Sequence, residues 1–277
     1  MPRNSIGNLR FIAVLGALGS ITLFGAGCNK LKSRDNLNKG VNAFRAGQYS
    51  AAADAFKTAI DLDPDFPVAR LYLATAYMSQ YVPGSDTPEN KQNASAAMDQ
   101  FQRVLKDDPK NLLATQSLAN LYYQMKDFKN AEEWNKKVIE IDPKNKEAYY
   151  TLGVIAWTQF VPPDREAKNA QGLKPEEGPL KPPKNKKEPD VKADLKAKYW
   201  QPLSDGIEDE KKALAIDPEY ENAMAYMNLL IRYRADMDDT KEDYQKDIKE
   251  ADDWVQKSLE TTKAKAAKKA ASQQTTE

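Results

Sequence analysis

The sequence contains no histidine, and it has a single cysteine among its 277 residues. The commonest general base and metal ligand in proteins is therefore missing, which argues against an enzyme or a metal site. One cysteine cannot form a disulfide within the chain, so the fold depends on packing alone. An excess of one charge is also lacking, because 41 Lys and Arg residues balance 41 Asp and Glu residues. This balance predicts no general attraction to nucleic acid.

The one long apolar segment lies near the N-terminus. After the basic start of the chain, the run FIAVLGALGSITLFGAG at residues 11–27 carries no charge and ends at Cys28. A basic region followed by an apolar region indicates a secretory signal. The small residues Ala26 and Gly27 resemble the end of a bacterial lipoprotein signal, although Gly25 stands where that family has an aliphatic residue.

This resemblance implies that residues 1–27 are a signal peptide and that Cys28 is lipidated as the mature N-terminus. A short linker, residues 28–32, would follow. The alternative is an uncleaved anchor helix, although the run is slightly shorter than the roughly 20 residues that span a bilayer. Both interpretations predict a membrane-anchored protein of the cell envelope, with its body facing the periplasm or the cell exterior.

Four Asp-Pro pairs mark an internal repeat. Similar segments end at Pro64, Pro109, Pro143 and Pro218, and Pro109 and Pro143 lie 34 residues apart. A 34-residue period with a closing proline resembles the tetratricopeptide repeat (TPR), which is a pair of helices. The resemblance implies an all-α fold, a right-handed α-solenoid of about five TPR helix pairs after the signal or anchor segment. The expected TPR domain covers residues 33–260, with repeats at about 33–66, 67–111, 112–145, 146–220 and 221–260.

Small residues at fixed places in the first repeat predict how its two helices pack. Gly40, Ala52 and Ala59 allow two antiparallel helices to approach closely, and Phe56 fills the space between them. Pro64 ends the second helix, since proline has no backbone N–H to donate. We therefore expect the small residues and Phe56 to share one core.

Longer spacings in the second and fifth repeats indicate inserts between the two helices. Thr87 and Pro88 predict the start of a lengthened helix, with Thr87 as its N-cap. Thr240 with Asp243 resembles a capping box at the start of another. Both inserts are therefore expected to extend the second helix of their repeat.

The largest insert lies in the fourth repeat. Residues 162–189 are rich in proline and lysine, which predicts a mobile loop, and a second helix is expected to begin near Asp190. The low-complexity tail, residues 261–277, is expected to fray.

The TPR resemblance also implies a binding surface, because the first helix of each repeat lines the concave side of the array. Positions 2, 5, 9 and 12 of that helix face the groove in the family. The candidate partner-binding residues are Phe44, Leu71, Met78, Gln116, Asn120, Tyr123, Tyr150, Trp157 and Arg232. Aromatic and Met side chains with amides among them suit an extended peptide that has apolar anchors. The alternative is that these side chains only pack the inside of the solenoid.

Other site classes find little support in the sequence, and no cofactor is expected. The acidic stretch from Asp236 to Asp247 has Lys241 where a calcium-binding loop needs glycine. No Gly-rich phosphate loop or nucleophile with an adjacent base is present. The TPR clamp for C-terminal carboxylates needs Lys and Arg beside Asn, so Asn120 alone does not indicate one.

The sequence therefore predicts a membrane-anchored TPR scaffold that binds a protein or peptide partner, not an enzyme. The alternative is a carrier lipoprotein that holds a small apolar molecule beside Met78, Tyr150 and Trp157.

Overall fold

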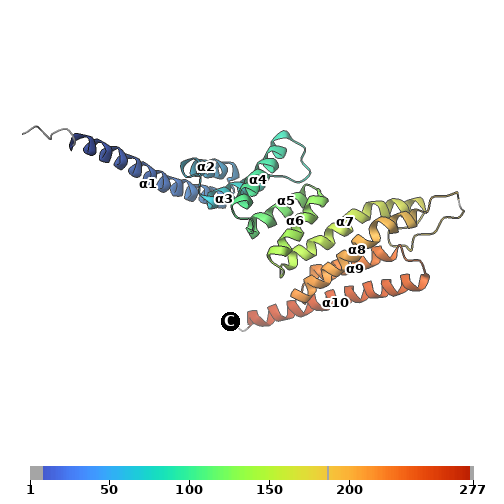
Figure 1. Cartoon of the computed structure of the whole chain (residues 1–277). Helices are drawn as coiled ribbons and strands as arrows, with labels where there is room; N and C mark the ends of the chain where they lie inside the picture. Colours follow the sequence, from blue (N-terminus) through green and yellow to red (C-terminus); the bar gives the residue numbers. More distant parts are fainter. Residues whose placement is uncertain (1–8, 186, 275–277) are drawn as a thin grey trace, which may run out of the picture. The chain divides into compact units, whose positions relative to one another are not determined.

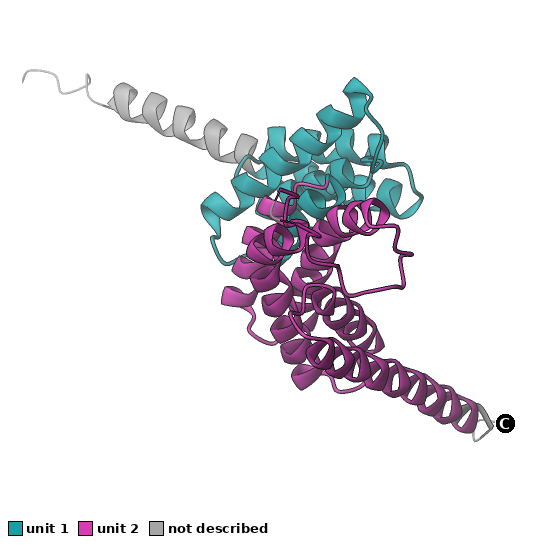
Figure 2. Ribbon diagram, turned by 90° about the vertical axis from the view of Figure 1, so that its right-hand side faces the viewer, with its two compact units in different colours: residues 1–125 teal, residues 126–277 magenta. Residues whose placement is uncertain are grey.

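The computed structural model describes the backbone of residues 9–185 and 187–274, and the side chains of residues 27–185 and 187–271. These residues form ten α-helices and no strand (Figure 1). The chain divides into two compact units, residues 1–125 and 126–277 (Figure 2). The predicted all-α fold is confirmed.

The first unit contains α1 (Leu9–Arg45), α2 (Tyr49–Leu62), α3 (Pro67–Met78), α4 (Pro88–Asp107) and α5 (Leu112–Gln124). The second unit contains α6 (Phe128–Ile141), α7 (Lys146–Ala170), α8 (Val191–Ile216), α9 (Glu221–Ala235) and α10 (Lys241–Gln274). Within the units, α1 packs on α2, α3 on α4, α7 on α8 and α9 on α10.

Four helices end in the same way, ahead of an Asp-Pro pair. The backbone N–H groups of Asp63, Asp108, Asp142 and Asp217 each donate to the carbonyl four residues earlier, while the aspartates themselves have left the helical conformation. A proline follows each of them, and proline disfavours the helical conformation of the residue before it. The Asp-Pro pairs therefore close α2, α4, α6 and α8, as the sequence predicts.

Gly40 and Phe56 meet where α1 packs on α2. Both residues are buried, and a Cβ atom at residue 40 would lie 2.4 Å from Cε1 of Phe56. Ala52 and Ala59 are also fully buried. The Ser33 hydroxyl donates to the carbonyl of Ala59 at 2.7 Å and ties the start of the packed part of α1 to α2. The close approach predicted from the small residues is confirmed.

A buried asparagine shapes the loop that precedes α4. Asn90 accepts a hydrogen bond from the backbone N–H of Val82 at 2.7 Å, and its amide donates to the carbonyls of Val82 and Ser85 at 2.9 and 2.8 Å. Thr87 Oγ1 accepts from the backbone N–H of Asn90 at 3.3 Å, which confirms the predicted N-cap ahead of Pro88. α4 has 20 residues against 14 in α2, so the insert lengthens the helix as well as forming a loop.

The start of α1 differs from the expected linker. Residues 28–32 belong to the helix, where residues 27–32 are all exposed and Ser33 is the first buried residue among the described side chains. Of the predicted signal segment, residues 1–8 lie outside the described backbone and residues 1–26 outside the described side chains. Within the described part of the chain, no helix has both the length and the apolar character to span a membrane.

The insert of the fourth repeat differs from the loop that the sequence predicts at residues 162–189. α7 continues for about two turns past Pro162 and Pro163, so the irregular part is shorter than residues 162–189. The two prolines remove hydrogen bonds from the helix interior. The turns beyond them, however, bury the side chains of Asp164 and Lys168, and this packing keeps the segment helical.

The C-terminal tail also differs from its prediction, because α10 continues to Gln274. Lys265 donates to the carbonyl of Glu219 at 2.6 Å, and Lys268 pairs with the Glu219 carboxylate at 2.7 Å. These contacts hold the tail against the start of α9, where the sequence alone predicted fraying.

Glu210 takes the place in the fourth repeat that Phe56 and Phe101 fill in the first two. Its side chain is fully buried, and a Cβ atom at Gly153 of α7 would lie 2.3 Å from its Oε1. Within the described structure, neither carboxyl oxygen has a hydrogen-bond partner. Burial, assisted by the charge of Asp209, raises the pKa of Glu210 to about 10. The folded protein therefore holds this carboxyl group protonated at neutral pH.

We expect Glu210→Met to stabilise the protein increasingly as the pH rises from about 5 to about 9. The unfolded chain releases this proton near pH 4.5, whereas the folded chain keeps it up to about pH 10. The free energy of unfolding of the wild type therefore falls across this window as the pH rises, whereas that of Glu210→Met lacks this dependence. At pH 7 the loss in the wild type is about 3 kcal/mol. Urea unfolding of both proteins at several pH values measures the difference.

Glu208→Gln serves as the control, because Glu208 is exposed and its hydrogen bond with Lys211 lowers its pKa. The folded and unfolded pKa values of Glu208 both lie below the tested window, so its effect should not change with pH. A pH-independent effect of Glu210→Met would contradict the protonated state.

Candidate functional site

Five aromatic side chains form a continuous row where α7 and α9 pack together. The Tyr150 ring centre lies 5.5 Å from Tyr220 and 5.3 Å from Tyr226. The Trp157 ring centre lies 5.5 Å from Tyr226 and 6.3 Å from Tyr233. Each pair meets edge to face, an arrangement that contributes about 0.5–1.5 kcal/mol. All five rings are half-buried. We call these residues the aromatic row.

Helical spacing explains the row. Tyr150 and Trp157 are seven residues apart on α7, and Tyr226 and Tyr233 are seven residues apart on α9, so each pair lies on one face of its helix. Burial raises the pKa of Tyr220 and of Tyr233, which keeps both hydroxyl groups neutral at physiological pH. The row therefore presents apolar rings together with neutral hydroxyl groups.

Tyr150 and Trp157 are two of the three predicted groove residues in the second unit, and the row contains both. The third, Arg232, points toward α10, where its guanidinium pairs with Asp252 at 2.5 Å. The structure therefore places Arg232 in the α9–α10 contact and not in the row. Sequence reasoning missed Tyr226 and Tyr233, although their spacing on α9 repeats that of Tyr150 and Trp157.

The other six predicted groove residues lie in the first unit: Phe44, Leu71, Met78, Gln116, Asn120 and Tyr123. Phe44 packs into the core of the first helix pair, with its ring centre 5.1 Å from that of Tyr49. Asn120 is exposed, and the remaining four are half-buried. Their role in binding stays a prediction.

The exposed apolar side chains of the first unit include three on its helices α3 and α5. Val68 and Tyr72 of α3 and Leu113 of α5 expose 45%, 38% and 53% of their surface. Val68 and Leu113 are each the second residue of the first helix of a repeat, the position that the TPR resemblance predicts to face the groove. Sequence analysis identified that position without naming these residues.

A buried lysine fastens the large insert to the second unit. Lys168 Nζ pairs with Asp236 at 2.7 Å and with Asp164 at 3.4 Å, and it donates to the carbonyl of Pro175 at 3.0 Å. All three charged side chains are almost fully buried. The backbone N–H of Leu180 donates to the carbonyl of Asp236 at 2.9 Å. The insert, expected to be mobile, is thus held against α7 and the end of α9.

Charge pairing determines the ionisation of the three buried side chains, Lys168, Asp164 and Asp236. Burial raises the pKa of Asp236 to about 7 and also raises the pKa of Asp164, while the charge of Lys168 opposes both shifts. Burial alone would lower the pKa of Lys168, but its two carboxylate partners together outweigh that effect and raise it. Lys168 therefore stays charged and compensates the buried carboxylates.

We expect Lys168→Met to lower the free energy of unfolding by about 3–5 kcal/mol, because it leaves two buried carboxyl groups without a cation. The insert should also detach, which would speed tryptic cleavage after Lys184. Urea unfolding and timed proteolysis measure the two effects. Adding Asp236→Met should recover part of the stability.

The matched control is Lys91→Met, which removes the exposed pair between Lys91 and Asp86 and should leave the free energy of unfolding nearly unchanged, because solvent screens exposed ion pairs. Equal losses for the two lysines would show that Lys168 is not the fastening residue.

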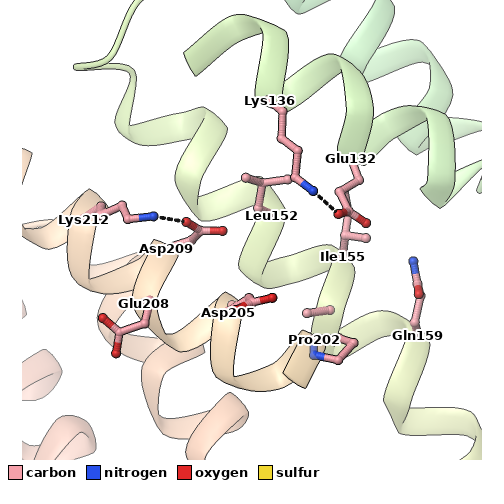
Figure 3. A pocket seen from close by; sticks show the side chains of 12 residues that line it. Glu132, Lys136, Leu152, Ile155, Gln159, Pro202, Asp205, Glu208, Asp209 and Lys212 are labelled. Carbon is pink, nitrogen blue, oxygen red and sulfur yellow. Dashed lines mark hydrogen bonds and ion pairs between the residues drawn. The ribbon is translucent and has the colours of Figure 1, made fainter. Parts of the chain in front are cut away.

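Three cavities lie within the second unit. The first, of about 300 Å³, lies among α6, α7 and α8 (Figure 3). The second, of about 320 Å³, lies beside the acidic stretch, and the third, of about 430 Å³, lies between the insert and the start of α10. None of these three is lined by Met78, Tyr150 or Trp157.

The acidic stretch is engaged in ion pairs. Asp239 pairs with Lys196 at 2.6 Å, and Asp247 pairs with Arg234 at 2.8 Å. Among the described side chains, no three His, Cys, Asp or Glu residues are arranged to hold a metal ion. Asp238 differs, because one of its carboxylate oxygens is buried without a hydrogen-bond partner among the described residues, and burial raises its pKa to about 6.

Successive helices, with Asp-Pro pairs closing α2, α4, α6 and α8, define a helical-repeat fold. Residues 43–80 and 91–155 match the model of the tetratricopeptide repeat family. This part of the chain therefore contains tetratricopeptide repeats, and the solved structures described next show the same α-solenoid fold.

Solved structures support the fold. The crystal structure of MamA protein is 16% identical and aligns with a TM-score of 0.54 over 85% of this chain and 94% of that chain. The structure of MamA 41-end from Desulfovibrio magneticus RS-1 is 17% identical, with a TM-score of 0.54 over 84% of this chain and 96% of that chain. A search of the curated proteins found no match.

Proposed function

We propose that this protein is a membrane-anchored TPR scaffold that binds a protein or peptide partner through the aromatic row. The observation that carries the proposal is the row itself, five half-buried rings in continuous contact along α7 and α9. Tyr and Trp are enriched among the residues that dominate binding energy. They offer a large rigid surface at a small entropic cost because only two side-chain torsions become fixed.

The first unit supplies a second apolar surface for the same function. Val68 and Leu113 stand at the same position of successive first helices and leave about half of their surface in contact with solvent. Exposed apolar residues at repeating positions suit a partner that lies in extended form across the repeats. The predicted residues Leu71 and Gln116, three places further along each helix, extend this surface.

The cavities favour the scaffold over a carrier of small apolar molecules. A carrier needs an enclosed apolar site. The cavity among α6, α7 and α8 is lined by six charged side chains, and neither Tyr150 nor Trp157 lines any of the three cavities described above. The proposed activity is therefore recruitment of a protein or peptide partner.

A photo-crosslinking amino acid in place of Tyr226 should capture the partner in intact cells as discrete adducts. The same amino acid in place of Asp253, which is exposed on α10, should not. Trp157→Ala should lower the yield at position 226 by roughly tenfold or more, because truncating a central aromatic contact costs about 2 kcal/mol or more. Gel shifts measure the yield, and circular dichroism checks that the variant is folded. Equal yields at the two positions would contradict the proposed surface.

We further propose that a lipid on Cys28 anchors the protein in the cell envelope. The sequence supports this anchor through the basic start, the uncharged run at residues 11–27 and the small residues before the cysteine. The exposure of residues 27–32 is compatible with it, because Ser33 is the first buried residue among the described side chains of the first repeat.

Cys28→Ser should remove the lipid and leave the precursor unprocessed or release the protein from membranes. Mass spectrometry of the purified protein and membrane fractionation measure the two effects. Asn38→Ala, an exposed change in the same helix, should behave as the wild type. Unchanged mass and fractionation of Cys28→Ser would favour the uncleaved anchor helix instead.

A further inference from the structure

The cavity among α6, α7 and α8 has an apolar floor and charged walls. Leu152 and Ile155 of α7 form the floor, and α8 contributes Asp205 and Asp209 on one side (Figure 3). The opposite wall comes from α6, which carries Glu132 and Lys136. None of the residues in the aromatic row lines this cavity, so it is a separate feature of the second unit.

The walls carry more negative than positive charge. Four carboxylates, those of Glu132, Asp205, Glu208 and Asp209, face two ammonium groups, those of Lys136 and Lys212. Both lysines are already paired: Lys136 Nζ lies 2.5 Å from a Glu132 oxygen, and Lys212 Nζ lies 2.8 Å from an Asp209 oxygen. Glu208 pairs with Lys211, outside the lining, at 2.7 Å. Asp205 is then the one lining carboxylate without an ion pair among the described residues, and it accepts a hydrogen bond from the Gln201 amide at 2.7 Å. The cavity therefore retains the unbalanced negative charge of Asp205.

The imbalance is concentrated on α8. Asp205 and Asp209 are four residues apart on one face of the helix, where like charges repel. Burial raises the pKa of Asp209, and the charge of Asp205 adds to that shift while Lys212 opposes it. A cation placed between these two carboxylates would remove their repulsion.

We propose that this cavity binds the cationic side chain of a protein partner, an alkylammonium or alkylguanidinium group carried by lysine or arginine. The carboxylates of Asp205 and Asp209 receive the charged head, and Leu152 and Ile155 pack against the methylene stem. Long basic side chains bury their stems along apolar surface in this way while pairing their heads. A volume of about 300 Å³ is at the lower end for ligand pockets, which suits one side chain.

The site supplies the proposed scaffold with a contact made by α6 and α8, the second helices of their pairs. It does not depend on the aromatic row, because the residues and the helix faces differ. If the cavity does not bind a basic side chain, crosslinking of the partner at position 226 is still expected. If crosslinking at position 226 fails, binding of a basic side chain in the cavity is still expected.

The test uses the full chain in detergent micelles, with isotope-labelled Ile and Leu methyl groups. Titration with lysine blocked at both ends should shift the methyl signals of Ile155 and Leu152 in a saturable manner, and so should blocked arginine. Blocked norleucine, which has a similar stem and no charge, should produce no comparable shift. Equal shifts with norleucine, or none with lysine and arginine, would overturn the proposal.

Variants test whether the carboxylates of Asp205 and Asp209 cause the methyl shifts. Asp205→Asn with Asp209→Asn should weaken binding of blocked lysine by at least tenfold. Asp205→Asn alone, at an exposed position, should weaken it severalfold without changing the melting temperature. Glu140→Gln, an equal loss of charge at an exposed position of α6, should leave binding unchanged. Undiminished binding in the double variant would overturn the assignment of the head group.

A free diamine identifies the source of the cation. Putrescine has two ammonium groups and no peptide backbone. Weaker or equal binding of putrescine relative to blocked lysine supports a side chain of a protein partner. Much tighter binding of putrescine would show that the cavity is a site for small amines instead.

Discussion

The close approach of two helices through a small residue is the packing constraint on which this fold depends. Gly40 leaves room for the buried ring of Phe56, and without that room α1 and α2 could not lie so near each other. The Asp-Pro pairs fix where each second helix ends, so the next first helix starts at a set distance along the chain. Side chains seven residues apart on α7 and α9 can then meet, and the aromatic row results.

The fourth pair keeps this geometry with different chemistry. Gly153 again provides the close approach, but the large side chain opposite is Glu210 and not a phenyl ring. A protonated carboxyl group can fill the space, although its oxygens lack hydrogen-bond partners among the described residues. Burying a polar group in this way costs free energy. The fourth pair therefore carries a local weakness that the first two pairs, with Phe56 and Phe101, do not have.

Local signals in the sequence were enough to predict the helix pairs. Each Asp-Pro pair acts on its own backbone, and Thr87 caps the helix that begins at the next residue, so both features can be recognised without any tertiary contact. The same reasoning found Tyr150 and Trp157 from their positions in one helix. The same reasoning could not identify Tyr226 and Tyr233 on α9 as their partners. The sequence of one helix does not show which distant helix it contacts.

Tertiary contacts also explain where local signals misled. Pro162 and Pro163 normally end a helix, yet α7 continues because the next turns bury Lys168 against Asp236, which lies far along the chain. The charged cavity could not be predicted for a similar reason, since its walls come from two repeats. Long-range pairing of charges therefore accounts for much of what the sequence did not reveal.

The exposed residues 27–32, which precede the packed part of α1, have a consequence for the distance between the first repeat and the membrane. Ser33, the first of the described side chains that is buried against α2, lies five positions after Cys28. In a helix this separation corresponds to a rise of about 8 Å, which is close to the depth of a lipid headgroup layer. With the proposed lipid on Cys28, the first helix pair would stand directly on the headgroups. A partner of this pair would then have to approach along the membrane surface.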